Sequence, residues 1–116
     1  MPTRPTRLSL LLLALLPLAA PSGAARAQEV PSYVVTAKDG RLSPAQIEVP
    51  AGKRIKLVVK NEGRGPIEFE NLDLRVEKVL APGASSFVVT PPLRPGSHTF
   101  INEFHPETGK LQLIAK

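Results

Sequence analysis

The most constraining feature of this chain is a series of short segments in which apolar and polar residues alternate, separated by turns rich in proline and glycine. A period of two residues is typical of strands that have one face in a core. No window shows a helical period over three turns. The segments lie about 8 to 12 residues apart, a spacing that predicts an all-β fold, namely a Greek-key β-sandwich of about 7–8 strands. They span residues 33–38, 47–49, 54–61, 67–70, 76–80, 87–90, 97–102 and 111–115.

Residues 1–27 have the features of a secretory signal peptide. Two arginines precede an apolar run over residues 8–20, and an A-x-A sequence at 25–27 offers a cleavage site. The run is shorter than the about 20 residues that a membrane-spanning helix needs. We therefore expect a signal peptide at 1–27, a single domain at 28–116, a periplasmic location and no membrane anchor after cleavage.

The chain contains no cysteine, so the domain is expected to rely on an ordinary apolar core and not on disulfides. Three of its 15 basic residues lie in the signal segment, which leaves 12 against 10 acidic residues. The basic residues are scattered and not interleaved with aromatic residues, so nucleic-acid binding is not expected. The inward positions of the alternating segments predict a core that includes Tyr33, Val35, Ile55, Leu57, Val59, Phe69, Phe87, Val89, Phe100 and Leu111.

The stretch over residues 95–113 holds both histidines of the chain and reads as strand, loop and strand. Its sequence, PGSHTFINEFHPETGKLQL, resembles the carboxy-terminal ligand loop of the cupredoxins, in which a cysteine, a histidine and a methionine bind copper. His105 matches the histidine of that loop, whereas Asn102 stands at the cysteine position and Lys110 at the methionine position. A blue-copper centre needs a thiolate, so we do not expect one here.

A second resemblance covers most of residues 44–113. The strings PIEFENLDLRVEKVLAPG and PLRPGSHTFINEFHPETGKL are similar to the cupredoxin-like domain of periplasmic iron-uptake proteins, found at the amino end of EfeO and as a separate protein in the FtrABCD ferrous-iron system. This resemblance implies a metal-binding accessory in ferrous-iron uptake. Its implied partners are an iron permease or other periplasmic iron-uptake components.

Glu68, Glu103 and His105 are the candidate metal ligands, with Glu70 as a weaker candidate. In a cupredoxin-type sandwich the loop before Glu68 and the loop that carries Glu103 and His105 meet at one end, so we expect these three side chains to converge. One imidazole with carboxylates suits Cu(II) or iron. These ligands are expected to need no further proton loss at pH 7, and His105→Ala is expected to abolish tight binding.

Other charged residues of the chain have simpler explanations. His98 lies in the middle of a predicted strand and is expected to be structural. Glu70, Glu77 and Lys78 could form cross-strand ion pairs, and Glu77 is expected to be structural. No motif indicates a nucleophilic or zinc-dependent hydrolase. Three hypotheses stay open: a metal-binding accessory in iron uptake, a metal-free docking module of an iron permease complex, and a ferroxidase component of that complex.

Overall fold

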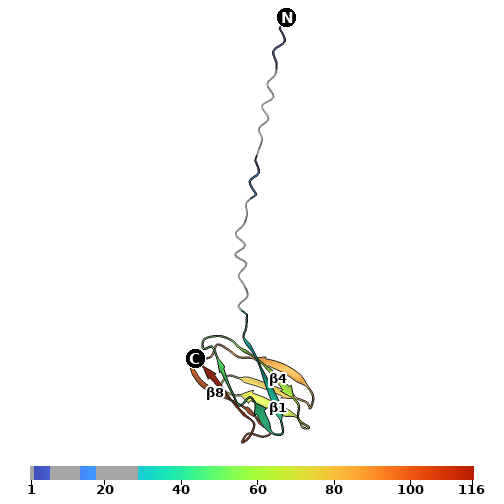
Figure 1. Ribbon diagram of the computed structural model, residues 1–116, viewed down its shortest axis with the longest axis vertical. Helices are drawn as coiled ribbons and strands as arrows, with labels where there is room; N and C mark the ends of the chain where they lie inside the picture. Colours follow the sequence, from blue (N-terminus) through green and yellow to red (C-terminus); the bar gives the residue numbers. More distant parts are fainter. Residues whose placement is uncertain (1, 6–13, 18–28) are drawn as a thin grey trace.

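The computed structural model describes residues 2–5, 14–17 and 29–116. Within these ranges the chain forms nine β-strands in two layers, so the predicted all-β sandwich is confirmed (Figure 1). The predicted signal peptide falls for the most part outside the described ranges, and within them no helix is long and apolar enough to cross a membrane. The strands are β1 (Ser32–Lys38), β2 (Arg41–Ser43), β3 (Gln46–Val49), β4 (Lys56–Asn61), β5 (Ile67–Asn71), β6 (Val76–Leu80), β7 (Ser85–Val89), β8 (Gly96–Asn102) and β9 (Lys110–Ala115).

The strands form a four-stranded sheet in the order β2-β1-β4-β7 and a five-stranded sheet in the order β3-β9-β8-β5-β6. Each sheet contains one parallel pair, β1 with β4 and β3 with β9, and its other pairs are antiparallel. The chain changes sheet after β2, β3, β4, β6 and β7. This path brings the β1–β2 turn, the β4–β5 loop and the β8–β9 loop to one end of the sandwich.

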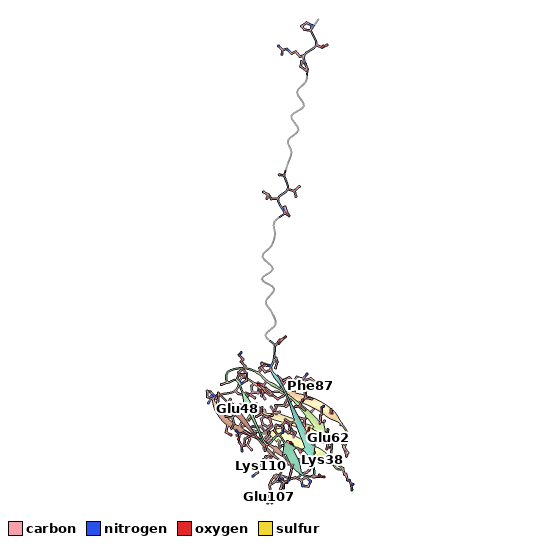
Figure 2. The ribbon with its side chains drawn as sticks, in the orientation of Figure 1. Lys38, Glu48, Glu62, Phe87, Glu107 and Lys110 are labelled. Atoms are coloured by element: carbon pink, nitrogen blue, oxygen red, sulfur yellow. The ribbon has the colours of Figure 1, made fainter. Side chains whose placement is uncertain are left out.

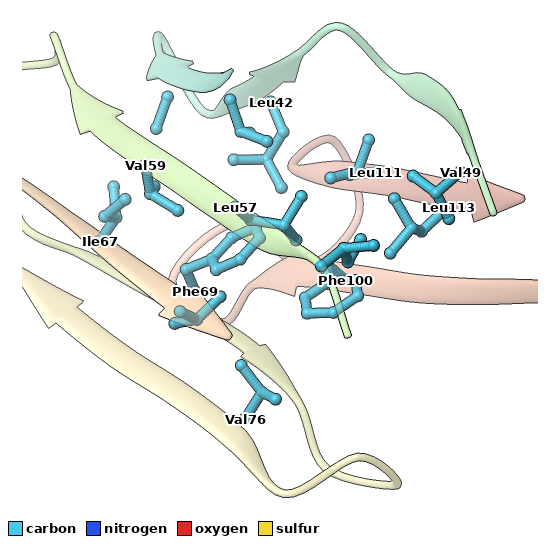
Figure 3. Close-up of a cluster of buried hydrophobic side chains, with 14 of the residues drawn as sticks. Leu42, Val49, Leu57, Val59, Ile67, Phe69, Val76, Phe100, Leu111 and Leu113 are labelled. Atoms are coloured by element: carbon cyan, nitrogen blue, oxygen red, sulfur yellow. The ribbon is translucent and has the colours of Figure 1, made fainter. Parts of the chain in front are cut away.

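The core lies between the two sheets and is built mainly from the strand residues whose side chains face inward. Phe69 of β5 and Phe100 of β8 are fully buried and stacked, with ring centroids 5.1 Å apart (Figure 3). Leu57 of β4 belongs to the same cluster of buried side chains. Tyr33 is only half-buried and packs against the edge of the core. Burial of each large apolar side chain contributes about 1.5–3 kcal/mol, so this cluster is the main source of stability.

Two of the predicted core residues lie on the outside. Phe87 and Val89 are 52% and 41% exposed, while Val88 between them is buried. Phe87 covers the outer face of β4 instead, with the ammonium of Lys56 4.3 Å from its ring centroid. The assignment of Phe87 and Val89 to the core is therefore wrong, because three consecutive apolar residues show no alternation that would mark the inward face.

Candidate functional site

The β8–β9 loop is fixed by its own backbone. The N–H of His105 donates to the carbonyl of Asn102 at 2.9 Å, and the N–H of Gly109 donates to the carbonyl of His105 at 2.8 Å. A Cβ atom on Gly109 would lie 2.9 Å from both the Cβ of Asn102 and the carbonyl oxygen of His105, so the close approach requires glycine. The loop therefore holds His105 in one place.

His105 lies beside the β1–β2 turn. Its ring atoms Cγ and Nδ1 are 3.3 Å from the position that a Cβ on Gly40 would occupy. The histidine lines a hollow of about 250 Å³ between the three loops at this end, which we call the end pocket, and neither Glu68 nor Glu103 lines it. Figure 2 shows Lys38, Glu107 and Lys110 gathered toward the same end of the sandwich.

The candidate carboxylates lie on the outer face of the five-stranded sheet. Glu68 and Glu70 alternate along β5 with Phe69, which faces the core, so both carboxylates point outward. Glu77 of β6 lies directly opposite Glu70 in the antiparallel register. One carboxylate oxygen of each of the three glutamates lies within 4.8 Å of the others.

Glu103 completes this group of acids. Its N–H donates to the carbonyl of Glu68 at 2.8 Å, which anchors the start of the β8–β9 loop to β5. Its carboxylate is close enough to share a hydrogen bond with that of Glu70. We call Glu68, Glu70, Glu77 and Glu103 the carboxylate cluster.

Mutual repulsion and burial change the acidity of the cluster. Burial, followed by the hydrogen bond with Glu103 and the negative charges around it, raises the pKa of Glu70 to about 7. The hydrogen bond with Glu77 is the main cause that raises the pKa of Glu68 above its ordinary value, with burial and the charges of Glu77 and Glu103 adding to it. The cluster therefore retains a proton near neutral pH, and the expectation that its ligands need no further proton loss at pH 7 is corrected.

Glu70 is the unusual member of the cluster, because it is a carboxylate with only 6% of its surface exposed. Its hydrogen-bond partner is another carboxylate. Within the described part of the chain the one ion pair joins Lys116 to Glu48 at 2.8 Å, so the expected cross-strand ion pairs among Glu70, Glu77 and Lys78 are not formed. A buried carboxylate without a cation is costly, and the cluster is suited to receive one.

The metal-free protein is expected to become less stable as the pH rises from about 5 to 8. The pKa of Glu70 is about 7 in the folded protein, whereas an unperturbed glutamate, as in the unfolded chain, has a pKa of 4.5. Between these two pH values the folded chain therefore binds a proton that the unfolded chain does not. The contribution of Glu70 to stability is then fully present below the lower value and is lost as the pH rises through the upper one. Thermal melts over this range should show a fall of a few degrees, and Glu70→Gln should flatten it. A melting temperature that rises with pH would contradict the prediction.

The structure brings Glu68, Glu70 and Glu103 together, adds Glu77, and leaves His105 apart. This corrects the expected geometry, in which Glu68 and Glu103 converge with His105. The reason is that β5 directs Glu68 to the outer face of its sheet, whereas the β8–β9 loop packs His105 against Gly40 at the end. Glu77 was not predicted as a candidate ligand. The register of the β5–β6 hairpin, which places Glu77 opposite Glu70, is the feature of the sequence that could have indicated it.

The residues at the end pocket do not fit a cupredoxin copper centre. Asn102, at the position of the copper-binding cysteine, is 2% exposed, and its Oδ1 accepts the N–H groups of Glu68 and Phe104, both at 3.2 Å. His105 and Asp39 are the only residues among those lining the pocket with an imidazole, thiolate, thioether or carboxylate. Such a donor set lacks the soft ligands that define blue-copper sites.

Adding Cu(II) to the protein is therefore expected to give no intense visible absorption band. The band of blue and purple copper sites arises from thiolate-to-copper charge transfer, and this chain has no cysteine. A visible spectrum recorded during a Cu(II) titration checks the result. An intense band would show that the alignment of Asn102 with the cysteine position does not describe the copper chemistry of this chain.

His98 has a structural place, as expected. It lies half-buried in β8, and its Nε2 forms a hydrogen bond of 2.8 Å with the carbonyl oxygen of Arg94. The contact ties the start of β8 to the β7–β8 loop. His98 does not line the end pocket, and it is not a member of the carboxylate cluster.

Comparisons with known proteins agree with this fold. A family model described as a cupredoxin-like domain matches residues 8–115. An uncharacterized protein of Rickettsia prowazekii (strain Madrid E) is 34% identical over 76 residues, which are 66% of this chain and 61% of that protein. The chain thus spans less than two thirds of the length of this relative.

Solved structures with low sequence identity share the fold. Auracyanin from Roseiflexus castenholzii is 15% identical, with a TM-score of 0.60 over 73% of this chain and 96% of auracyanin. The metal-binding domain of the Cu(I)-exporting P-type ATPase CopA of Streptococcus pneumoniae D39 is 13% identical, with a TM-score of 0.62 over 72% and 84% of the two chains. A purple cupredoxin from Nitrosopumilus maritimus is 15% identical, with a TM-score of 0.54 over 72% and 98%. At these identities the likeness concerns the fold alone.

Proposed function

This chain belongs to the cupredoxin-like domain family, and on that premise we propose that it is a periplasmic metal-binding protein that serves as an accessory in ferrous-iron uptake. The metal would be held by the carboxylate cluster on the outer face of the five-stranded sheet. The end pocket, where cupredoxins bind copper, would not hold it. The partners would be an iron permease or other periplasmic iron-uptake components.

The observation that carries this proposal is the convergence of the four carboxylates around the buried Glu70. One oxygen each from Glu68, Glu70 and Glu77 lies within 4.8 Å of the others. Two oxygens on opposite sides of a cation with bonds of about 2.0–2.6 Å are roughly 4 to 5 Å apart, so the three fit around one ion. A cation would replace the shared proton and remove the repulsion between the acids.

The chemistry of the cluster favours a hard cation. Oxygen donors without thiolate or thioether suit hard and borderline cations, among which iron and Cu(II) are the proposed metals, and do not suit Cu(I). When bound, such a metal would supply a positive charge that these four side chains lack. The protein would contribute a rigid platform, because Glu68, Glu70 and Glu77 stand on paired strands and the N–H of Glu103 is bonded to β5.

The role in iron uptake is supported by the motifs that carry the resemblance. The segments that resemble the iron-uptake domains are EFE at 68–70, EK at 77–78 and EFHP at 103–106. All four glutamates in these segments are members of the carboxylate cluster. The shared motifs therefore coincide with a single group of side chains in space, although the sequence separates them by up to 35 residues.

Calorimetric titration tests the proposal. We expect Cu(II), or Fe(II) added without oxygen, to bind at about one equivalent, with a heat that depends on the ionisation enthalpy of the buffer because binding displaces the proton of the cluster. The dependence should grow as the pH falls from about 8 to about 6, because Glu70 then carries its proton more fully before the metal binds. Absence of heat with both metals would reject the metal-binding function.

One feature favours the docking-module hypothesis as the second candidate. The outer face of the four-stranded sheet exposes Val34, Phe87 and Val89 next to Lys56. Exposed aromatic and apolar residues of this kind are typical of interaction surfaces.

A ferroxidase component, the third hypothesis, would instead consume oxygen when many equivalents of Fe(II) are added. An oxygen electrode measures this consumption.

A further inference from the structure

The end pocket contains a hydrogen-bond donor that the protein itself does not use. Asn102 is almost fully buried, and its Oδ1 is occupied by the N–H groups of Glu68 and Phe104. In the described part of the chain, the side-chain NH₂ group of Asn102 donates no hydrogen bond. Every completely covered side-chain nitrogen or oxygen atom in that part does have a hydrogen-bond partner. The NH₂ group is therefore not completely covered by protein, and Asn102 lines the end pocket.

Basic side chains surround the same pocket. Lys38 and Arg64 line it together with His105, and Asp39 is the one acid among the lining residues. Neither Lys38 nor Arg64 forms an ion pair with a described residue. The two basic side chains outnumber the one carboxylate of the lining, so the pocket attracts an anion more than a cation.

Two hydrogen bonds of the Asn61 side chain fix the loop that carries Arg64. The buried Asn61 donates from Nδ2 to the carbonyl of Gly65 at 2.9 Å and accepts the N–H of Gly63 on Oδ1 at 3.0 Å. These two bonds close the β4–β5 loop on either side of Arg64. A guanidinium on such a fixed loop is suited to bind a carboxylate with paired hydrogen bonds.

We propose that the end pocket binds a small carboxylate anion, with the NH₂ group of Asn102 and the guanidinium of Arg64 as donors and Lys38 supplying further positive charge. The carboxylate group needs several donors and no acceptor, which is what the lining offers. A volume of about 250 Å³ suits a molecule of a few carbon atoms. The site is separate from the carboxylate cluster, so it does not depend on the proposed function.

Nuclear magnetic resonance titration of the protein with sodium acetate, and separately with sodium citrate, tests the proposal at constant ionic strength set with sodium chloride. We expect saturable shifts of the Asn102 side-chain NH₂ signal and of the backbone N–H groups of Gly63, Arg64 and Gly65. Citrate, with three carboxylates, should saturate at the lower concentration. Shifts that do not saturate, or that spread over exposed lysines elsewhere, would overturn the proposal.

Three variants locate the site. Asn102→Asp keeps an oxygen to accept the N–H groups of Glu68 and Phe104 but replaces the donor with a negative charge, so it should abolish binding. Arg64→Gln should weaken binding about tenfold or more, the loss expected for a charged hydrogen bond. Arg94→Gln, an exposed basic residue that does not line the pocket, is the matched control and should bind like the wild type. If Asn102→Asp does not fold, equal binding by the Arg64 and Arg94 variants still refutes the site.

Discussion

Replacing Phe100 with alanine is expected to lower the free energy of unfolding by about 3–5 kcal/mol. The ring is fully buried between the sheets and stacks on Phe69 with centroids 5.1 Å apart, so the change removes both the buried area and the aromatic contact. A small domain has only about 5–15 kcal/mol of stability, so the effect is a large part of the total. Equilibrium urea unfolding followed by circular dichroism measures it.

The chain supplies its own control, because two of its four phenylalanines are exposed. Phe87→Ala and Phe104→Ala should each cost less than about 1 kcal/mol, since these rings are 52% and 49% exposed. If Phe87→Ala costs as much as Phe100→Ala, β7 turns the opposite face to the core. Should Phe100→Ala fail to fold, the smaller change Phe100→Leu gives the same comparison.

Much of the fold could be predicted from the alternation of residue types. The strand over Val76–Leu80 was predicted with its exact bounds, and other segments with clear alternation differ from the observed strands by one or two residues at their ends. The strand Arg41–Ser43 was not predicted, because three residues are too few to show a period and its pairing with β1 defines it. The error at Phe87 and Val89 has a related cause, since a continuous apolar run does not reveal which side faces inward.

The candidate site was less accessible to sequence reasoning than the fold. Resemblance to cupredoxins indicated that the loops near Glu68 and Glu103 meet, and they do, since the N–H of Glu103 is bonded to the carbonyl of Glu68. It could not show that Glu68 lies on the outer face while His105 lies at the end, because this depends on the direction in which each backbone presents its side chain. The raised pKa of Glu70 depends on burial and on neighbours from three strands or loops, which no local pattern contains.

Replacing Glu70 with glutamine is expected to weaken the binding of Cu(II) or Fe(II) at least about 100-fold. The change keeps the shape of the side chain but removes one negative oxygen ligand from the centre of the cluster, and loss of even an outer partner of a metal ligand typically costs about 10–100-fold. The metal-free variant should at the same time be more stable than the wild type at about pH 8, because it buries no charge. Loss of binding could then not be attributed to unfolding. Calorimetric titration and thermal melts measure the two effects.

Two further variants decide which part of the molecule holds the metal. Glu107→Gln changes an exposed acid of the β8–β9 loop that is not in the carboxylate cluster, so it should bind like the wild type. His105→Ala removes the one imidazole at the end pocket and should also retain binding if the cluster is the site. Loss of binding in His105→Ala together with normal binding in Glu70→Gln would instead place the metal at the end of the sandwich. The carboxylates would then be a source of pH-dependent stability only.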